Sequence, residues 1–84
     1  MANLLVTPEA QDQLLALPKA VRARILNVLE RLKHWPEVSG AKPLRQSLAG
    51  RYRIRTGDYR VQFRVRAGDV MVEKIGHRDR FYEE

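Results

Sequence analysis

The segment from Arg51 to Arg66 alternates apolar and polar side chains with a period of two, a pattern typical of β-strands with one buried face. Gly57 and Asp58 interrupt the alternation and are suited to a two-residue hairpin turn. With this turn the two strands pair in one register only. One face of the predicted hairpin then carries the apolar residues Tyr52, Ile54, Tyr59, Val61 and Phe63.

The other face of the hairpin is strongly basic. It carries Arg51, Arg53, Arg55, Arg60, Gln62 and Arg64. The register sets Arg55 opposite Arg60 and Arg51 opposite Arg64, and such like-charge pairs destabilise a sheet by about 0.2 to 1 kcal/mol each. A sequence selected only for folding would avoid these pairs, so we expect a surface that binds an anion. The structural alternative is a solvated face on which the long arginine stems cover neighbouring surface.

Composition and net charge limit the partners, metal sites and cellular location that we expect for this chain. The 84 residues suffice for a single domain, predicted to span 1–84, and the formal net charge of +6 favours nucleic acid, anionic membrane or an acidic protein as partner. No cysteine is present, and the two isolated histidines, His34 and His77, argue against a metal site, so neither metal nor cofactor is expected. No apolar stretch is long enough for a membrane helix and no signal peptide is evident, so we expect a cytoplasmic protein without a membrane partner.

The first half of the chain predicts a short strand followed by two helices. Residues 4–6 form an apolar run, after which Thr7 and Pro8 are suited to the N-cap and first position of a helix. We expect helices over about 8–17 and 19–34, separated by Pro18, each with one apolar stripe.

The second half is predicted to be mainly strand. A long connection over 36–50, anchored by Leu44 and Leu48, leads into the hairpin. A turn at 67–69 and a strand over 70–76 follow, and a short tail runs from His77 to Glu84. The expected order is β-α-α-β-β-β.

This order, together with three local motifs, resembles the RelE/ParE superfamily of toxin–antitoxin toxins, and specifically its RelE-like branch of messenger-RNA endonucleases. The motifs are the run from Leu44 to Leu48 that leads to Gly50–Arg55, the segment Gly57–Val61, and Gly76–Arg78 with Tyr82 four residues further on. An arginine-rich hairpin alone would be weak evidence. The three motifs in order, after two helices of suitable length, are specific.

The resemblance implies an α+β, RelE-like fold in which two N-terminal helices pack on a mainly antiparallel, twisted sheet. It also implies the toxin of a type II toxin–antitoxin system, a metal-independent mRNA interferase that cleaves messenger RNA in the ribosomal A site. The nucleophile would be a ribose 2′-hydroxyl that attacks the adjacent phosphate. The implied partners are a cognate acidic antitoxin, mRNA and the ribosome with its 16S rRNA.

Site residues follow from the resemblance position by position. Arg60 and Arg78 match the phosphate-binding and transition-state arginines, and Tyr82 matches an aromatic residue that stacks on a nucleobase. Arg53 and Arg55 stand where well-studied members often have lysines. The implied RNA-binding set is Arg51, Arg53, Arg55, Arg60, Arg64, Arg78 and Arg80.

An arginine serves poorly as a general base, because it stays protonated, so the departure at Arg53 and Arg55 leaves the proton acceptor open. We predict His77 for this role, since histidine titrates near neutral pH and the cations at Arg78 and Arg80 favour its neutral form. The structural alternatives are a strand-end histidine bonded to backbone and, for Tyr82, a cap on the core beside Phe81.

Two rival functions remain open. A ParE-like protein shares the fold but inhibits DNA gyrase by protein contact, which requires no phosphate-cleaving set of residues. A catalytically inactive relative would bind RNA or the ribosome without cutting, an alternative favoured by the absence of the family lysines.

Overall fold

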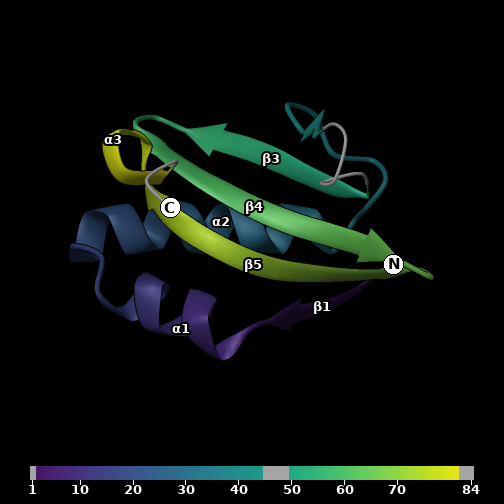
Figure 1. The fold of residues 1–84 in the computed structure, drawn as a ribbon, viewed down its shortest axis with the longest axis horizontal. Helices are drawn as coiled ribbons and strands as arrows, with labels where there is room; N and C mark the ends of the chain where they lie inside the picture. Colours follow the sequence, from purple (N-terminus) through teal and green to yellow (C-terminus); the bar gives the residue numbers. More distant parts are fainter. Residues whose placement is uncertain (1, 45–49, 82–84) are drawn as a thin grey trace.

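The computed structural model describes residues 2–44 and 50–81, which form a five-stranded sheet and three helices (Figure 1). The elements are β1 (Asn3–Val6), α1 (Pro8–Leu15), α2 (Lys19–Leu32), β2 (Lys42–Pro43), β3 (Arg51–Thr56), β4 (Tyr59–Arg66), β5 (Asp69–His77) and α3 (Arg78–Phe81). The strand order is β1-β5-β4-β3-β2. β1 runs parallel to β5, and the other neighbouring pairs are antiparallel, so the predicted α+β class with a mainly antiparallel sheet is confirmed.

The N-terminal helices begin where the sequence predicts. Thr7 is the N-cap of α1 and its hydroxyl accepts a hydrogen bond from the backbone N–H of Ala10 at 3.1 Å, while Pro8 opens the helix. α1 then lies along β5 beyond the end of β1, and the Gln13 side chain accepts a hydrogen bond from the N–H of Ile75 at 2.7 Å. This bond gives a backbone donor of β5 a partner where β1 no longer runs beside it.

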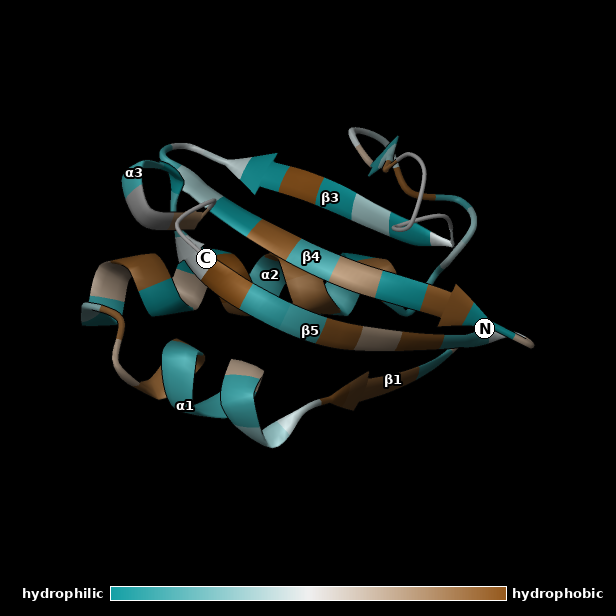
Figure 2. Ribbon diagram, in the orientation of Figure 1, coloured by the Kyte–Doolittle hydropathy of each residue, from teal (hydrophilic) through white to brown (hydrophobic). Residues whose placement is uncertain are grey.

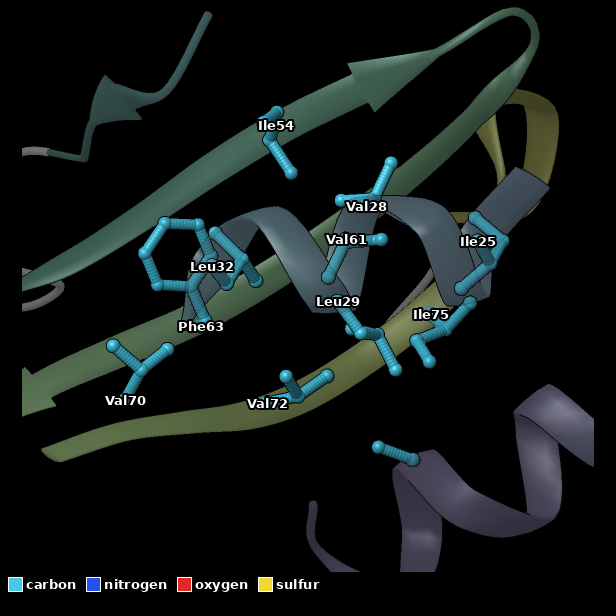
Figure 3. Close-up of a cluster of buried hydrophobic side chains, with 11 residues drawn as sticks. Ile25, Val28, Leu29, Leu32, Ile54, Val61, Phe63, Val70, Val72 and Ile75 are labelled. Atoms are coloured by element: carbon cyan, nitrogen blue, oxygen red, sulfur yellow. The ribbon is translucent and has the colours of Figure 1, made fainter. Parts of the chain in front are cut away.

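α1 and α2 cover one face of the sheet, and the hydrophobic core lies between them and the strands (Figures 1 and 3). The buried cluster consists of Ala10, Ile25, Val28, Leu29, Leu32, Ile54, Val61, Phe63, Val70, Val72 and Ile75. At its edge the Trp35 ring packs edge-on against Tyr52 and Phe63, with ring centroids 4.7 and 5.4 Å apart. α1 and α2 leave the other face of β3 and β4 uncovered, and hydrophobic and hydrophilic positions alternate along both strands (Figure 2).

The hairpin of β3 and β4 has the predicted register throughout, from Arg51 opposite Arg64 to Thr56 opposite Tyr59. Gly57, with φ of +59°, occupies the first position of the two-residue turn, where a side chain would be strained. A Cβ there would also lie 3.2 Å from Nη1 of Arg24, so α2 reaches the hairpin tip from the covered side.

Three details differ from the sequence prediction. The connection over 36–50 contains a short edge strand, β2, which pairs with β3; two residues are too few to show a periodic pattern. α1 and α2 each end two residues earlier than expected. His77, the first residue of the predicted tail, ends β5, and the next four residues form one helical turn, α3. Leu48 lies outside the described residues. Within the described ranges, no helix has the length and apolar character needed to cross a membrane.

Candidate nucleic-acid interface

The uncovered side of the sheet forms a basic surface, which we call the arginine face. Because opposed residues of an antiparallel pair share a face, the observed register places Arg51, Arg53 and Arg55 of β3 beside Arg64, Gln62 and Arg60 of β4. Ile54, Val61 and Phe63 point the other way into the core. The sheet therefore holds the guanidinium groups on one side by burying their neighbours on the other.

Positive charge is densest at the hairpin tip. Partial burial is the largest cause that lowers the pKa of Arg60 from its ordinary value. The positive charges of Arg55, Arg53 and Arg78 lower it further, while the negative charge of Asp58 opposes the shift. We call these four arginines the Arg60 cluster. A bound phosphate would relieve this mutual repulsion, so the arrangement favours anion binding.

The hairpin turn orients the Arg60 guanidinium. Its Nη1 donates hydrogen bonds to the carbonyl oxygens of Gly57 and Tyr59, both at 3.2 Å. These are neutral acceptors, so they hold the side chain without cancelling its charge. Arg60 therefore keeps its charge and the remaining donors of its planar fork for a phosphate.

Asp58 joins the hairpin tip to α3. Its carbonyl oxygen accepts a hydrogen bond from the backbone N–H of Arg78 at 2.7 Å. The Arg78 guanidinium also lies 3.8 Å from Asp58 Oδ1 and 3.6 Å from Asp79 Oδ1, but these contacts are largely exposed and contribute little to stability. The backbone bond is thus the contact that brings Arg78 to the same end of the face as Arg60.

α3 folds back onto the arginine face. Gly76 stands opposite Arg60, and a Cβ at this position would lie 3.6 Å from Cδ1 of Phe81. Phe81 is 2 % exposed although it lies apart from the core cluster between helices and sheet. Lys74 donates a hydrogen bond to the Phe81 carbonyl, and its ammonium lies 4.7 Å from the centroid of the Phe81 ring.

Sequence reasoning missed two lysines on this face. Lys74 is opposite Gln62 and lies beside the Arg60 cluster; Lys42, on the edge strand β2, is opposite Arg53. The signal for Lys74 was the spacing of buried Val72 and Ile75, which differ by three positions and so break the period of two. Lys42 gave no signal, because β2 is too short.

The break in period is a β-bulge at Glu73, and it places a carboxylate on the basic surface. β5 has Val72 opposite Phe63 but Lys74 opposite Gln62, so Glu73 is the extra residue. Its carboxylate accepts hydrogen bonds from Arg51, at 2.7 Å from Nε and 3.4 Å from Nη2, and this raises the pKa of Arg51. The ion pair spans β4, which lies between the two strands, and neutralises the middle of the face.

His77 does not join the arginines. It is opposite Tyr59, and the two rings pack edge to face with centroids 5.2 Å apart. Tyr59 packs against the core, so this pair lies on the helix side of the sheet. His77 Nδ1 accepts a hydrogen bond from the backbone N–H of Asp79 at 3.1 Å.

Tyr82 and the side chain of Arg80 lie outside the described part of the chain.

Comparison with known proteins assigns the family. The family model described as ParE toxin of type II toxin–antitoxin system, parDE, matches residues 4–82. The chain belongs to this family. It is therefore a toxin of a type II toxin–antitoxin system within the RelE/ParE superfamily. A comparison with curated proteins found no match.

Solved structures similar to this toxin include RelE proteins. The toxin is 26% identical to a chain of the RelBE2 toxin–antitoxin complex from Mycobacterium tuberculosis, with 92% of the toxin and 98% of that chain covered and a TM-score of 0.79. It is 27% identical to a chain of an archaeal RelE–RelB complex from Pyrococcus horikoshii, with 94% of the toxin and 97% of that chain covered and a TM-score of 0.76. The isolated Escherichia coli RelE toxin, at 20% identity, 92% and 84% coverage and a TM-score of 0.77, shares the fold.

The contacts of Lys74 predict that this lysine holds α3 of the toxin on the sheet. In Lys74→Met, the hydrogen bond to the Phe81 carbonyl is lost, and amide hydrogen exchange of residues 78–81 should rise about tenfold, since a bond from a charged donor is worth about 1.5 to 3 kcal/mol. Amides in the centre of β4 should exchange as before.

The matched control is Lys33→Met, which removes an ammonium that pairs with Glu30 at 2.7 Å on the exposed surface of the helices. This control should leave exchange over 78–81 unchanged. Equal exchange rates in Lys74→Met and wild type would show that Lys74 does not hold α3.

Proposed function

We propose that this toxin is an endoribonuclease that cleaves messenger RNA in the ribosomal A site. The observation that carries the proposal is the Arg60 cluster, in which four guanidinium groups gather at one end of an uncovered sheet face. Phosphodiester cleavage through a 2′-hydroxyl passes through a phosphorane with two negative charges, and fixed cations stabilise that charge as it develops.

Each arginine has a proposed role. Arg60, whose guanidinium is oriented by the turn carbonyls, holds the oxygens of the scissile phosphate. Arg78, tied to the hairpin through Asp58, stabilises the transition state and faces the leaving 5′-oxygen. Arg53 and Arg55 bind the flanking RNA backbone, and Tyr82 stacks on a base next to the cut.

The proposed reaction uses no metal ion or cofactor, because the substrate supplies the nucleophile and arginine supplies positive charge. The position of His77 argues against it as the proton acceptor. His77 packs on the helix side of the sheet, so we do not give it this role. Titratable groups other than arginine that lie near the cluster, within the described residues, are Asp58 and Asp79 beside Arg78, and Lys42, Lys74 and Glu73 on the arginine face.

The proposed protein partner is an acidic antitoxin that covers the arginine face. The similar structures from Mycobacterium tuberculosis and Pyrococcus horikoshii are a RelBE2 toxin–antitoxin complex and a RelE–RelB complex. An acidic segment complements a face with a marked excess of positive charge. Arg22 and Arg24 of α2 are proposed contacts with 16S rRNA or with the antitoxin.

A second candidate function is inhibition of DNA gyrase, which the ParE family match favours. A gyrase inhibitor acts through protein contact and has no need of the Arg60 cluster. We therefore place RNA cleavage first and use gyrase as the alternative to test. A toxin that bound RNA or the ribosome without cutting is the third possibility, and the same assay separates it.

Replacement of Arg60 tests the proposed function. Purified Arg60→Ala, added to programmed ribosomes, should cut the message about 10²- to 10³-fold more slowly than wild type or not at all, because a preorganised charge opposite the phosphorane is lost. Message ends mapped by primer extension give the rate and the position of the cut.

The control is Arg31→Ala, which removes the same charge from the exposed side of α2, where the Arg31 side chain donates a hydrogen bond to the Ser39 carbonyl. Its cleavage rate should stay within about twofold of wild type, because α2 lies on the opposite side of the sheet from the arginine face. An intact message with wild-type toxin would refute the nuclease assignment, and inhibition of gyrase supercoiling by the same preparation would support the alternative.

Replacement of His77 tests whether this residue is correctly excluded as the proton acceptor. His77→Gln should cut messages at a rate within about threefold of wild type between about pH 6 and 8, since the ring lies across the sheet from the arginines. If imidazole were the base, wild-type cleavage would decline as the pH falls through this range and the variant would be nearly inactive. That result would restore His77 to the site.

A further inference from the structure

The arginine face has a second positive region at the end of β4 remote from the Arg60 cluster. Arg64 and Arg66, both exposed, continue the row of alternate basic positions toward the end of the strand. Next to them is a cavity of about 260 Å³. It is lined by Leu5, Arg64, Arg66, Ala67, Asp69 and Met71, and we call it the far-end cavity.

The floor of the far-end cavity is apolar and open to solvent. Leu5 of β1 is opposite Met71 of β5, which is opposite Arg64, so the three side chains share the arginine face. Leu5 is 46% exposed and Met71 38% exposed. Folding gains little from two large apolar side chains left side by side in water, and such a patch indicates a binding surface.

The rim of the cavity is basic. Among the ion pairs of residues 2–44 and 50–81, none includes Arg64 or Arg66. Asp69, the one carboxylate at the cavity, accepts a hydrogen bond from the Asn3 side chain at 3.1 Å. The two guanidinium groups are therefore available to an external anion.

The spacing of the two regions matches an extended strand of nucleic acid. Arg60 and Arg66 are six residues apart on β4, or about 20 Å at the rise of an antiparallel strand. The neutral Arg51–Glu73 ion pair lies between the two regions. A chain with regularly repeated charges meets both positive regions at once, whereas charges along a protein segment need not repeat at this interval.

We propose that the far-end cavity binds a nucleotide of the RNA strand that the Arg60 cluster cuts. Arg64 and Arg66 hold its phosphates, and Leu5 and Met71 provide the apolar surface against which its base lies. This inference rests on the proposed function and extends it, because it makes the substrate several nucleotides longer than the site of cleavage. Single-strand binding surfaces combine a basic groove with a platform for the bases, which is usually aromatic and is formed here by Leu5 and Met71.

Binding of uncleavable RNA tests the proposal independently of catalysis. Fluorescence anisotropy would be measured with fully 2′-O-methylated oligonucleotides of two lengths. One of about 3 nucleotides covers a single positive region, and one of about 10 nucleotides spans the distance of about 20 Å between the two regions. The double variant Arg64→Gln/Arg66→Gln should bind the longer oligonucleotide about tenfold more weakly than wild type. The slope of the logarithm of its binding constant against the logarithm of the salt concentration should be shallower by about 1.4, since each phosphate contact on a single strand contributes about 0.7 to this slope.

The apolar floor is tested separately. Met71→Ser should weaken binding of the longer oligonucleotide about fourfold, the value of one buried methylene group. The control Leu15→Ser changes a side chain that is 58% exposed on α1 and should have no effect. Both cavity variants should bind the short oligonucleotide as wild type does.

The charge-matched control is Lys19→Gln/Arg31→Gln, which removes two exposed cations from α2. An equal loss of affinity in this control would show that the effect comes from the net charge of the protein and not from the cavity, and would overturn the proposal. Unchanged RNA binding in the cavity variants would overturn it too. Normal RNA binding combined with loss of neutralisation by the cognate antitoxin would assign the surface to a protein. A toxin that cuts no RNA would refute the proposed function and leave the binding result interpretable.

Discussion

Burial of alternate hairpin residues under α2 is the constraint on which the arginine face depends. Ile54, Val61 and Phe63 are at most 2% exposed, and each buried side chain of this size contributes about 1.5 to 3 kcal/mol. The like-charge pairs that the same register creates cost about 0.2 to 1 kcal/mol each. The free energy gained by burial therefore exceeds the cost of the like-charge pairs, so the folded sheet can hold opposed arginines close together for an anion to bind.

Irregular features then divide and complete this regular surface. The bulge at Glu73 brings a carboxylate to Arg51 and separates the Arg60 cluster from the far-end cavity. Asp58 and Lys74 fasten the two ends of α3, the first through the Arg78 backbone and the second through the Phe81 carbonyl. Gly76 leaves room for the Phe81 ring on the face. The positions of Arg78 and Phe81 thus depend on a few local contacts.

The sequence predicts the regular part of this toxin and misses the irregular part. Period-two alternation determines the hairpin and its register, because a slip of one residue would bury the arginines. The three-residue spacing of Val72 and Ile75 marks an irregularity in β5, but not which residue is the extra one. That Lys42 belongs to an edge strand and that α3 folds back depend on contacts between distant segments, which the alternation could not reveal. His77 was predicted from its neighbours in sequence, and strand alternation sends it to the opposite face from Arg60. The role of Tyr82 stays a prediction.

The most direct test of the account is the chemistry of the ends that the toxin leaves on a message. Attack by the 2′-hydroxyl, with the Arg60 cluster around the phosphate, should produce a 2′,3′-cyclic phosphate or 3′-phosphate upstream of the cut and a 5′-hydroxyl downstream. A 2′-deoxynucleotide at the cut position should abolish cleavage. Ends with a 3′-hydroxyl and 5′-phosphate, or an uncut message beside inhibited gyrase, would contradict the account.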